Sequence, residues 1–284
     1  MTTDTSPTPA RLPWPEYLIE GVLLGLFMVS ACVAVALLSH PQSPLSRDMP
    51  NPLAQRATIG VLMGLTAIGL IYSPWGKRSG AHMNPAVTIA FMALGKVSRR
   101  DAAFYVLSQF VGGAMGVLFS SLLLGSWIES PSVDWVVTVP GPWGVTTAFM
   151  GEVGISFAIF FTVLFASNRP RLAPYTGMFA GALLAMFIAF ESPLSGTSLN
   201  PARTVASAIF AGNYTALWLY FVAPIGAMLL AAAVYSVAFG PRCVRCAKLC
   251  HSHSVRCIFD CAWCRHEPDT ARASRLPEPE TQPR

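Results

Sequence analysis

Charged residues are scarce in this chain, and their scarcity excludes most soluble folds. Asp, Glu, Lys and Arg make up 12% of the 284 residues, about half of their share in an ordinary soluble domain. They are absent from 102–128, 172–190 and 204–241. A helix on the surface of a soluble protein carries charge on its outer face. The uncharged stretches therefore indicate helices that lie in a bilayer, whose core of about 30 Å needs about 20 helical residues.

Two other classes of protein lack support in the sequence. The first apolar run, 16–39, is longer than the apolar core of a secretory signal peptide, and no small-residue cleavage site follows it. The net charge of +5 does not indicate nucleic-acid binding, because most basic residues fall in short loops and in the tail. Membrane topology explains them there, so we expect no nucleic-acid partner.

Apolar runs between helix breakers predict an all-α membrane protein with six transmembrane helices, at 16–39, 55–75, 102–127, 145–167, 173–190 and 214–238. Two more segments, about 84–95 and 200–211, are too short to cross the bilayer. Both begin with Asn-Pro-Ala. Asn is favoured at a helix cap and Pro at the first helical position, so each segment is predicted to be a re-entrant half-helix.

Basic residues gather on one side of these predicted spans. They follow the second, fourth and sixth spans, whereas the opposite connections carry fewer, with Arg47 and Arg56 in one of them. The positive-inside rule places the basic side and both termini in the cytoplasm. The basic residues on that side are Lys77, Arg78, Lys96, Arg99, Arg100, Arg169, Arg171, Arg242, Arg245 and Lys248.

The two short segments belong to an internal repeat. Residues 79–88 and 195–204 are identical at six of ten positions. Glu20 in the first span has a counterpart in Glu152 in the fourth, and Gly113-Ala114 in the third has Gly226-Ala227 in the sixth. The repeats cover 15–128 and 145–240. Because each repeat has three spans, an odd number, the second repeat is inverted in the membrane relative to the first.

Residues 79–88 read Ser-Gly-Ala-His-Met-Asn-Pro-Ala-Val-Thr, and 195–203 read Ser-Gly-Thr-Ser-Leu-Asn-Pro-Ala-Arg. With these motifs, residues 15–240 resemble the aquaporin and glycerol-facilitator family, also called major intrinsic proteins. The resemblance implies a homotetramer in the cell membrane with one pore in each subunit. Each pore would be a passive channel for water or small uncharged solutes that excludes protons and ions. The resemblance implies no enzymatic activity and no cofactor for transport.

The inverted repeat places the two half-helices N-terminus to N-terminus, and each end carries about half a positive charge. Non-helical backbone at this depth implies a watery lumen. If each asparagine oxygen caps its own helix, the amide N–H groups of Asn84 and Asn200 face the pore, although helix capping alone is the simpler alternative. The residues predicted to form this region are Asn84, Pro85, Ala86, Asn200, Pro201 and Ala202.

Charged residues inside the membrane receive roles from the resemblance. Arg203 is implied to be the arginine of the selectivity filter, with a salt bridge to a loop acid as the alternative. Glu20 and Glu152 are implied to brace the half-helix loops rather than to contact solute. His82 is implied to buttress the first motif.

The other filter positions, carried over by spacing from each motif, are Gly64, Ile188 and Thr197. Strict water channels have an aromatic residue and a histidine at the first two of these, and this chain has no His between His82 and His251. A wider, more apolar ring favours glycerol, ammonia, urea or a neutral metalloid acid. In contrast, Thr204 in place of an Asp and the pair Tyr220-Phe221 resemble water channels.

Six of the seven cysteines lie in the last 42 residues, and Cys32 in the first span is expected only to pack. A cytoplasmic tail keeps thiols reduced, so we expect a structural zinc site formed by Cys246, His251, Cys257 and Cys261. An all-Cys set, an iron-sulfur cluster, palmitoylation of Cys243 and unliganded thiols are the alternatives. The segments 1–14 and 267–284, outside the channel (15–240) and the Cys/His-rich segment (241–266), are predicted to be disordered.

Two rival functions remain open from the sequence. A secondary transporter is also built from inverted repeats with broken helices, but it needs an ion-coupling acid in the lumen. A membrane-anchored metalloenzyme would need an open metal position and a pocket in the tail.

Overall fold

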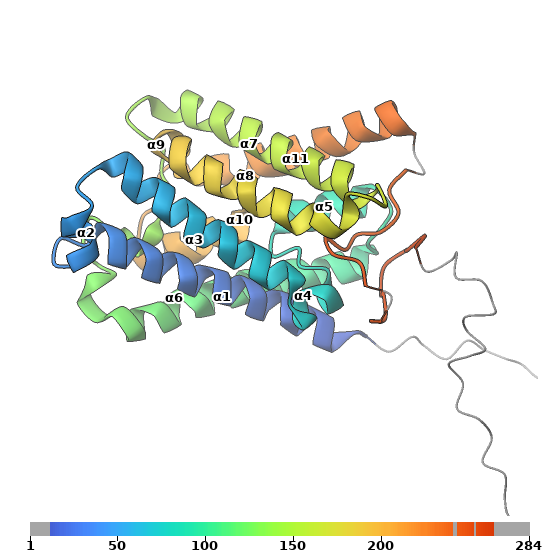
Figure 1. Ribbon diagram of the computed structural model, residues 1–284, viewed down its shortest axis with the longest axis horizontal. Helices are drawn as coiled ribbons and strands as arrows, with labels where there is room; N and C mark the ends of the chain where they lie inside the picture. The colour runs from blue at the N-terminus through green and yellow to red at the C-terminus, as the bar shows by residue number, and fades with distance from the viewer. Residues whose placement is uncertain (1–11, 241–242, 253, 264–284) are drawn as a thin grey trace, which may run out of the picture.

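A computed structural model describes residues 12–240, 243–252 and 254–263 as an elongated bundle of helices (Figure 1). Within these residues, six helical segments are long and apolar enough to cross a membrane, so the chain is an all-α integral membrane protein. The helices are α1 (Trp14–Ser39), α2 (Pro44–Asp48), α3 (Pro52–Tyr72), α4 (Pro74–Ser79), α5 (Pro85–Ala93), α6 (Arg99–Leu124), η1 (Gly125–Trp127), η2 (Asp134–Val136), α7 (Gly144–Ser167), η3 (Ala173–Tyr175), α8 (Thr176–Phe190), α9 (Ser192–Ser195), α10 (Pro201–Ala211) and α11 (Leu219–Phe239).

The predicted spans agree with these helices except at some ends. The second span was expected to reach residue 75, but α3 ends at Tyr72 because Ser73 adopts an extended conformation before Pro74 and caps α4. The sixth span was expected from residue 214, but α11 begins at Leu219 because 215–218 form turns. The two predicted half-helices are α5 and α10.

The helices pack as two inverted repeats. In the first repeat α1 packs along α6, and in the second α7 packs along α11. Each half-helix then crosses to the other repeat, so that α10 lies against α6 and α5 against α11. The second span of each repeat, α3 and α8, joins the halves at a long contact. The repeats therefore interlock around the half-helices rather than standing side by side.

Small residues permit the close helix contacts. A Cβ at Gly112 of α6 would lie 2.0 Å from the backbone oxygen of Gly21 in α1. Between α3 and α8, a Cβ at Gly64 would lie 2.5 Å from the oxygen of Gly181. No side chain fits at such distances, so these positions pack backbone against backbone, as is usual in membranes.

The Cys/His-rich segment lies across one end of the bundle, beside α4 and α5 (Figure 1). Of this predicted segment, 241–266, the structure describes 243–252 and 254–263. The segments predicted to be disordered, 1–14 and 267–284, lie outside the described residues apart from residues 12–14.

Candidate functional site

The loops before the two half-helices share one unusual backbone conformation. Positive φ angles occur at Ala81 (56°) and Met83 (48°) in the first loop, and at Thr197 (52°) and Leu199 (59°) in the second. Non-glycine residues rarely adopt such angles, and they do so where the surroundings hold them. The same strain at equivalent positions shows that the inverted repeat extends to the backbone of the loops.

Glu20 of α1 holds the first loop in this conformation. Its Oε1 accepts from the Ser79 hydroxyl at 2.6 Å and from the His82 backbone N–H at 3.1 Å. Its Oε2 accepts from the Met83 N–H at 2.7 Å and from the Gln109 amide at 3.0 Å. Glu20 is fully buried. Both of its carboxylate oxygens are therefore used in the loop and its support.

Glu152 of α7 repeats this arrangement in the second loop. It accepts from the Ser195 hydroxyl at 2.9 Å, from the Ser198 N–H at 2.5 Å and from the Leu199 N–H at 2.8 Å. Glu152, like Glu20, is fully buried. The two acids thus contact the loops as expected from their implied role as braces.

The two Asn-Pro-Ala motifs each start a half-helix with a side-chain cap. Asn84 Oδ1 accepts from the Ala86 N–H at 2.8 Å. Asn200 Oδ1 accepts from the N–H groups of Ala202 at 3.0 Å and Arg203 at 3.3 Å. Each cap satisfies N–H groups that have no partner inside the helix. The following prolines, Pro85 and Pro201, occupy the first helical positions.

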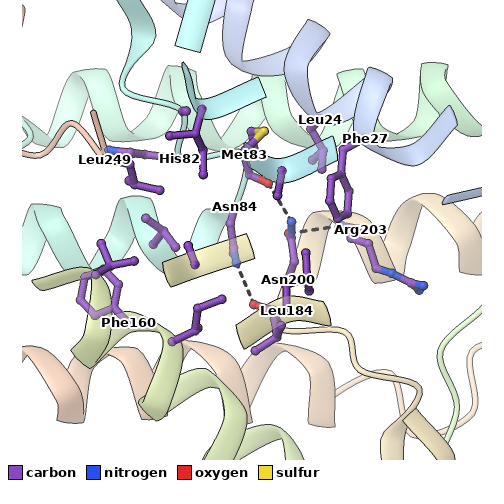
Figure 2. Close-up of a pocket in the computed structure, with 18 of the residues that line it drawn as sticks. Leu24, Phe27, His82, Met83, Asn84, Phe160, Leu184, Asn200, Arg203 and Leu249 are labelled. Carbon is purple, nitrogen blue, oxygen red and sulfur yellow. Dashed lines mark hydrogen bonds between the residues drawn. The ribbon is translucent and has the colours of Figure 1, made fainter. Parts of the chain in front are cut away.

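The asparagine amides also connect the two repeats. Asn84 Nδ2 donates to the Leu199 carbonyl at 2.8 Å, and Asn200 Nδ2 donates to the Met83 carbonyl at 2.7 Å (Figure 2). The tips of α5 and α10 therefore lie next to each other. An amide carries two N–H donors, so each asparagine retains one after this bond, and both residues line the same cavity.

Two cavities follow each other through the bundle. An inner cavity of about 120 Å³ is lined by the two asparagines and mostly by apolar side chains. An outer cavity of about 230 Å³ lies beyond it. Both are lined by Phe27, Leu184, Ser198 and Arg203, which mark the boundary between them. The inner volume is large enough for several water molecules.

Arg203 lies at this boundary. Its Nη1 donates to the Val136 carbonyl at 2.7 Å, which orients the guanidinium along the cavity wall. The alternative role of Arg203, a salt bridge to a loop acid, finds no support. Among the described residues the ion pairs are Arg78–Glu16 and Lys96–Asp260, and neither involves Arg203. Figure 2 shows Arg203 at one end of the inner cavity, beyond Asn200.

Gly64, expected in the filter, lies elsewhere. It packs against α8, where Gly181 leaves no room for a side chain. Met63 and Ile59 of α3 line the outer cavity instead. The expectation that Gly64 lines the filter is therefore wrong, because the rotation of α3 about its axis turns Gly64 toward α8. The pore-facing row on α3 follows a spacing of four residues, and Gly60 and Gly64 form a small-residue contact face that the sequence pattern already contained.

The other two expected filter positions do line the outer cavity. Ile188 of α8 contributes an apolar surface there. Thr197 is largely buried, and its hydroxyl donates to Glu191 Oε2 at 2.6 Å. Met63 and Arg203 line the same cavity, so two apolar and two polar residues meet its space.

His82 contacts both the first motif and the tail. Its Nδ1 lies 3.1 Å from the Thr88 hydroxyl, which in turn donates to the Asn84 carbonyl. Its Nε2 donates to the Ala247 carbonyl at 2.8 Å. The contact with the motif agrees with the implied buttress. The contact with the tail has no counterpart in the sequence analysis.

The structure brings together the four residues expected to bind zinc. The ligand atoms of Cys246, His251, Cys257 and Cys261 all lie within 4.8 Å of one another. The Sγ atoms of Cys246 and Cys257 are 3.6 Å apart, and Cys261 Sγ is 3.2 Å from His251 Nε2. Hydrogen bonding to the Cys257 thiol raises the pKa of Cys246 and raises that of His251 to about 9. Cys264 lies outside the described residues.

The chain resembles known proteins over most of its length. A family model described as "Major intrinsic protein" matches residues 14–235. Aquaporin NIP1-2 of Arabidopsis thaliana is 31% identical over 231 residues, which are 80% of this chain and 75% of that protein. Aquaporin-4 of Rattus norvegicus is 30% identical over 234 residues, 80% of this chain and 68% of that protein. An X-ray structure of the aquaglyceroporin from Plasmodium falciparum shares the fold, with a TM-score of 0.69, 18% identity and coverage of 81% and 98% of the two chains.

Proposed function

Because this chain belongs to the major intrinsic protein family and is a passive channel for water or small uncharged solutes, we propose that its pore runs through the two cavities. The observation that carries the proposal is the pair of asparagines at the joined tips of α5 and α10, both of which line the inner cavity. A solute would pass them in single file. The family consists of channels rather than enzymes, and this pathway needs no turnover chemistry.

Proton exclusion would follow from the half-helix tips. Each tip carries about half a positive charge, which repels cations. A water molecule accepting from the remaining N–H of Asn84 and of Asn200 would turn both its own hydrogens away from the centre. Such a water could not receive a proton from one neighbour and pass it to the other. A continuous proton wire would therefore be broken at this point.

Solute selection would take place in the outer cavity. Arg203 supplies hydrogen-bond donors and a positive charge, while Met63 and Ile188 supply apolar surface. This combination suits a small neutral solute that has both a carbon backbone and oxygen or nitrogen atoms. We propose that glycerol, urea or a neutral hydroxyl-bearing acid passes in addition to water.

The proposed orientation places the Cys/His-rich segment in the cytoplasm of the cell. Lys77 and Lys96, which the positive-inside rule assigns to the cytoplasm, both contact this segment. Arg47 lies in α2 and Arg56 near the start of α3, at the end of α3 away from Lys77.

We further propose a homotetramer in the cell membrane, on the resemblance alone. Chemical cross-linking in native membranes tests it, and a monomer as the largest species would contradict it.

Stopped-flow measurements on purified protein in liposomes test the proposed pore. Water, glycerol, urea and ammonia are each supplied as a gradient to the same preparation. The expected result is a flux above that of empty liposomes that rises in proportion to the gradient and needs no ion gradient. A saturable flux that depends on an ion gradient would instead indicate a secondary transporter. The buried acids Glu20 and Glu152 do not favour that function, because they are occupied by loop donors.

A further inference from the structure

The ligand atoms of four residues near the C-terminus, Cys246, His251, Cys257 and Cys261, lie within 4.8 Å of one another, close enough to share one metal ion. A zinc ion with Zn–S bonds of about 2.3 Å and Zn–N bonds of about 2.0–2.1 Å keeps neighbouring ligand atoms about 3.5–3.8 Å apart. The Cys246–Cys257 distance of 3.6 Å and the Cys261–His251 distance of 3.2 Å fall near this range. A disulfide would need about 2.05 Å between sulfur atoms. The set of three thiols and one imidazole matches a closed structural zinc site.

Little regular secondary structure stabilises the segment that carries these four residues. Its described residues, 243–252 and 254–263, contain no helix or strand. These two ranges form the two arms of the segment. Two backbone bonds join the arms, from the Ala262 N–H to the Arg245 carbonyl at 2.7 Å and, at the turn, from the Val255 N–H to the Ser252 carbonyl at 3.4 Å. Segments this short depend on a metal or a cross-link for a defined structure. Residues from both arms supply ligands, so one ion would hold the arms together.

One arm of the segment is seated deeply in the channel domain. The Lys248 side chain is 1% exposed, and its ammonium donates to the carbonyls of Lys77 at 2.8 Å and Arg256 at 3.1 Å. The next N–H, that of Leu249, donates to the Gly80 carbonyl at 3.1 Å. A charged side chain is buried so fully only when it is paired. These contacts lie between two of the metal ligands, Cys246 and His251.

The other arm covers the loop of the first half-helix. Phe259 stacks on His82, with ring centroids 5.5 Å apart and an interplanar angle of 10°. Next to it, the Asp260 N–H donates to the Lys96 carbonyl at 3.2 Å. His82 is therefore enclosed by both arms, since it also donates to the Ala247 carbonyl. The loop that carries Asn84 is thus covered by the Cys/His-rich segment.

The consequence for the pore lies at Leu249. This side chain is 7% exposed and lines the inner cavity together with Asn84 and Asn200. Figure 2 shows Leu249 at the end of the cavity opposite Arg203. An apolar side chain at a narrow pore mouth gates by excluding water. Leu249 also lines a neighbouring cavity of about 420 Å³, so this side chain lies where the two cavities adjoin.

We propose that residues 243–252 and 254–263 form a zinc-dependent plug. In this proposal, which rests on the pore described above, Cys246, His251, Cys257 and Cys261 bind one Zn²⁺ ion. The ion fixes the segment in the fold that seats Leu249 in the cytoplasmic mouth. Loss of the ion releases the arms and opens the pore. The channel therefore conducts less with the metal than without it.

The test uses the full-length protein in liposomes, with two separate measurements. Elemental analysis gives the zinc content per chain, and stopped-flow light scattering gives the water permeability before and after a membrane-permeant zinc chelator. The expected zinc content is one ion per chain. Chelation is expected to raise permeability several-fold, and added Zn²⁺ is expected to restore the low value. These measurements need no substitution and so do not depend on the folding of a variant.

Three variants separate the site from the plug. Cys257→Ser is expected to lose zinc and to conduct as the chelated protein does. Cys243→Ser changes a cysteine of the same segment outside the four and is expected to behave as the unchanged protein in both measurements. Leu249→Ala is expected to keep its zinc and still to conduct several-fold faster.

Each result bears on a different part of the proposal. A zinc content near zero in the unchanged protein would overturn the metal site. Full zinc occupancy with equal permeability in the loaded, chelated and Leu249→Ala forms would overturn the plug. If no form conducts faster than empty liposomes, the proposed pore itself fails along with the plug, while the zinc content still decides the site.

Discussion

The side-chain amide of Asn84 donates to the backbone carbonyl of Leu199 at 2.8 Å, across 115 residues of sequence. The cap of the first half-helix is thereby fastened to the loop that precedes the second. In the opposite direction, the side-chain amide of Asn200 donates to the Met83 carbonyl at 2.7 Å. A change at either asparagine therefore acts on both repeats, on helix capping, on loop position and on the charge at the pore centre.

Asn200→Asp is expected to weaken this centre. The carboxylate can still accept from the Ala202 N–H, but it cannot donate to the Met83 carbonyl, and it brings a negative charge to the half-helix tips. We expect a loss of stability of about 1–3 kcal/mol and a higher proton leak, measured with a pH-sensitive dye inside liposomes. Asn213→Asp is the control, since the Asn213 side chain accepts from the Thr215 N–H, and an aspartate can accept the same bond. A proton leak equal to that of the control would contradict the role of the amide.

Glu152→Gln tests the brace of the second loop. The carboxylate accepts three bonds, two of them from backbone N–H groups. A glutamine amide has one oxygen acceptor and would turn its NH₂ toward one of these donors. Leaving a buried donor unpaired costs about 1–3 kcal/mol, so thermal unfolding in detergent is expected at a lower temperature. Glu129→Gln, at an exposed position, is expected to leave unfolding unchanged.

Met63→Phe tests the corrected filter. The larger ring should narrow the outer cavity and reduce glycerol flux several-fold, with a smaller effect on water. Gly64→Ala is the matched change on the neighbouring residue, where the added methyl would meet the Gly181 oxygen. It is expected to lower stability while leaving the glycerol-to-water ratio of the folded channel unchanged. A shift in that ratio from Gly64→Ala, with none from Met63→Phe, would return Gly64 to the pore.

Arg203→Val replaces the arginine with the residue type that stands at the equivalent Val87 of the first motif. A unit charge about 4 Å from a cation repels it by roughly 4 kcal/mol at the effective dielectric of such sites. Removing that charge is expected to raise cation leak at least about tenfold, measured as current across planar bilayers. Arg203→Lys retains the charge but not the planar fork, so it should block cations and alter solute preference. Equal leak in both variants would argue against a charge barrier.

The sequence by itself determined the architecture and the chemistry of the pore centre. Uncharged runs, the repeated Asn-Pro-Ala segments and the matching acids Glu20 and Glu152 all follow from local composition and from an internal comparison. Such features depend on what the bilayer permits and on helix-capping preferences. The same holds for Cys246, His251, Cys257 and Cys261, whose residue types already indicated a shared site.

Only the tertiary structure decided how these parts face one another. The rotation of α3 is set by its packing on α8, which turns Gly64 to the helix interface and Met63 to the cavity. The hydrogen bonds from the asparagine amides to backbone carbonyls join residues more than 100 positions apart, and Leu249 lines the same cavity as the distant Asn84. Long-range packing selects such contacts, because no periodicity within a single segment encodes which side chain meets a distant backbone.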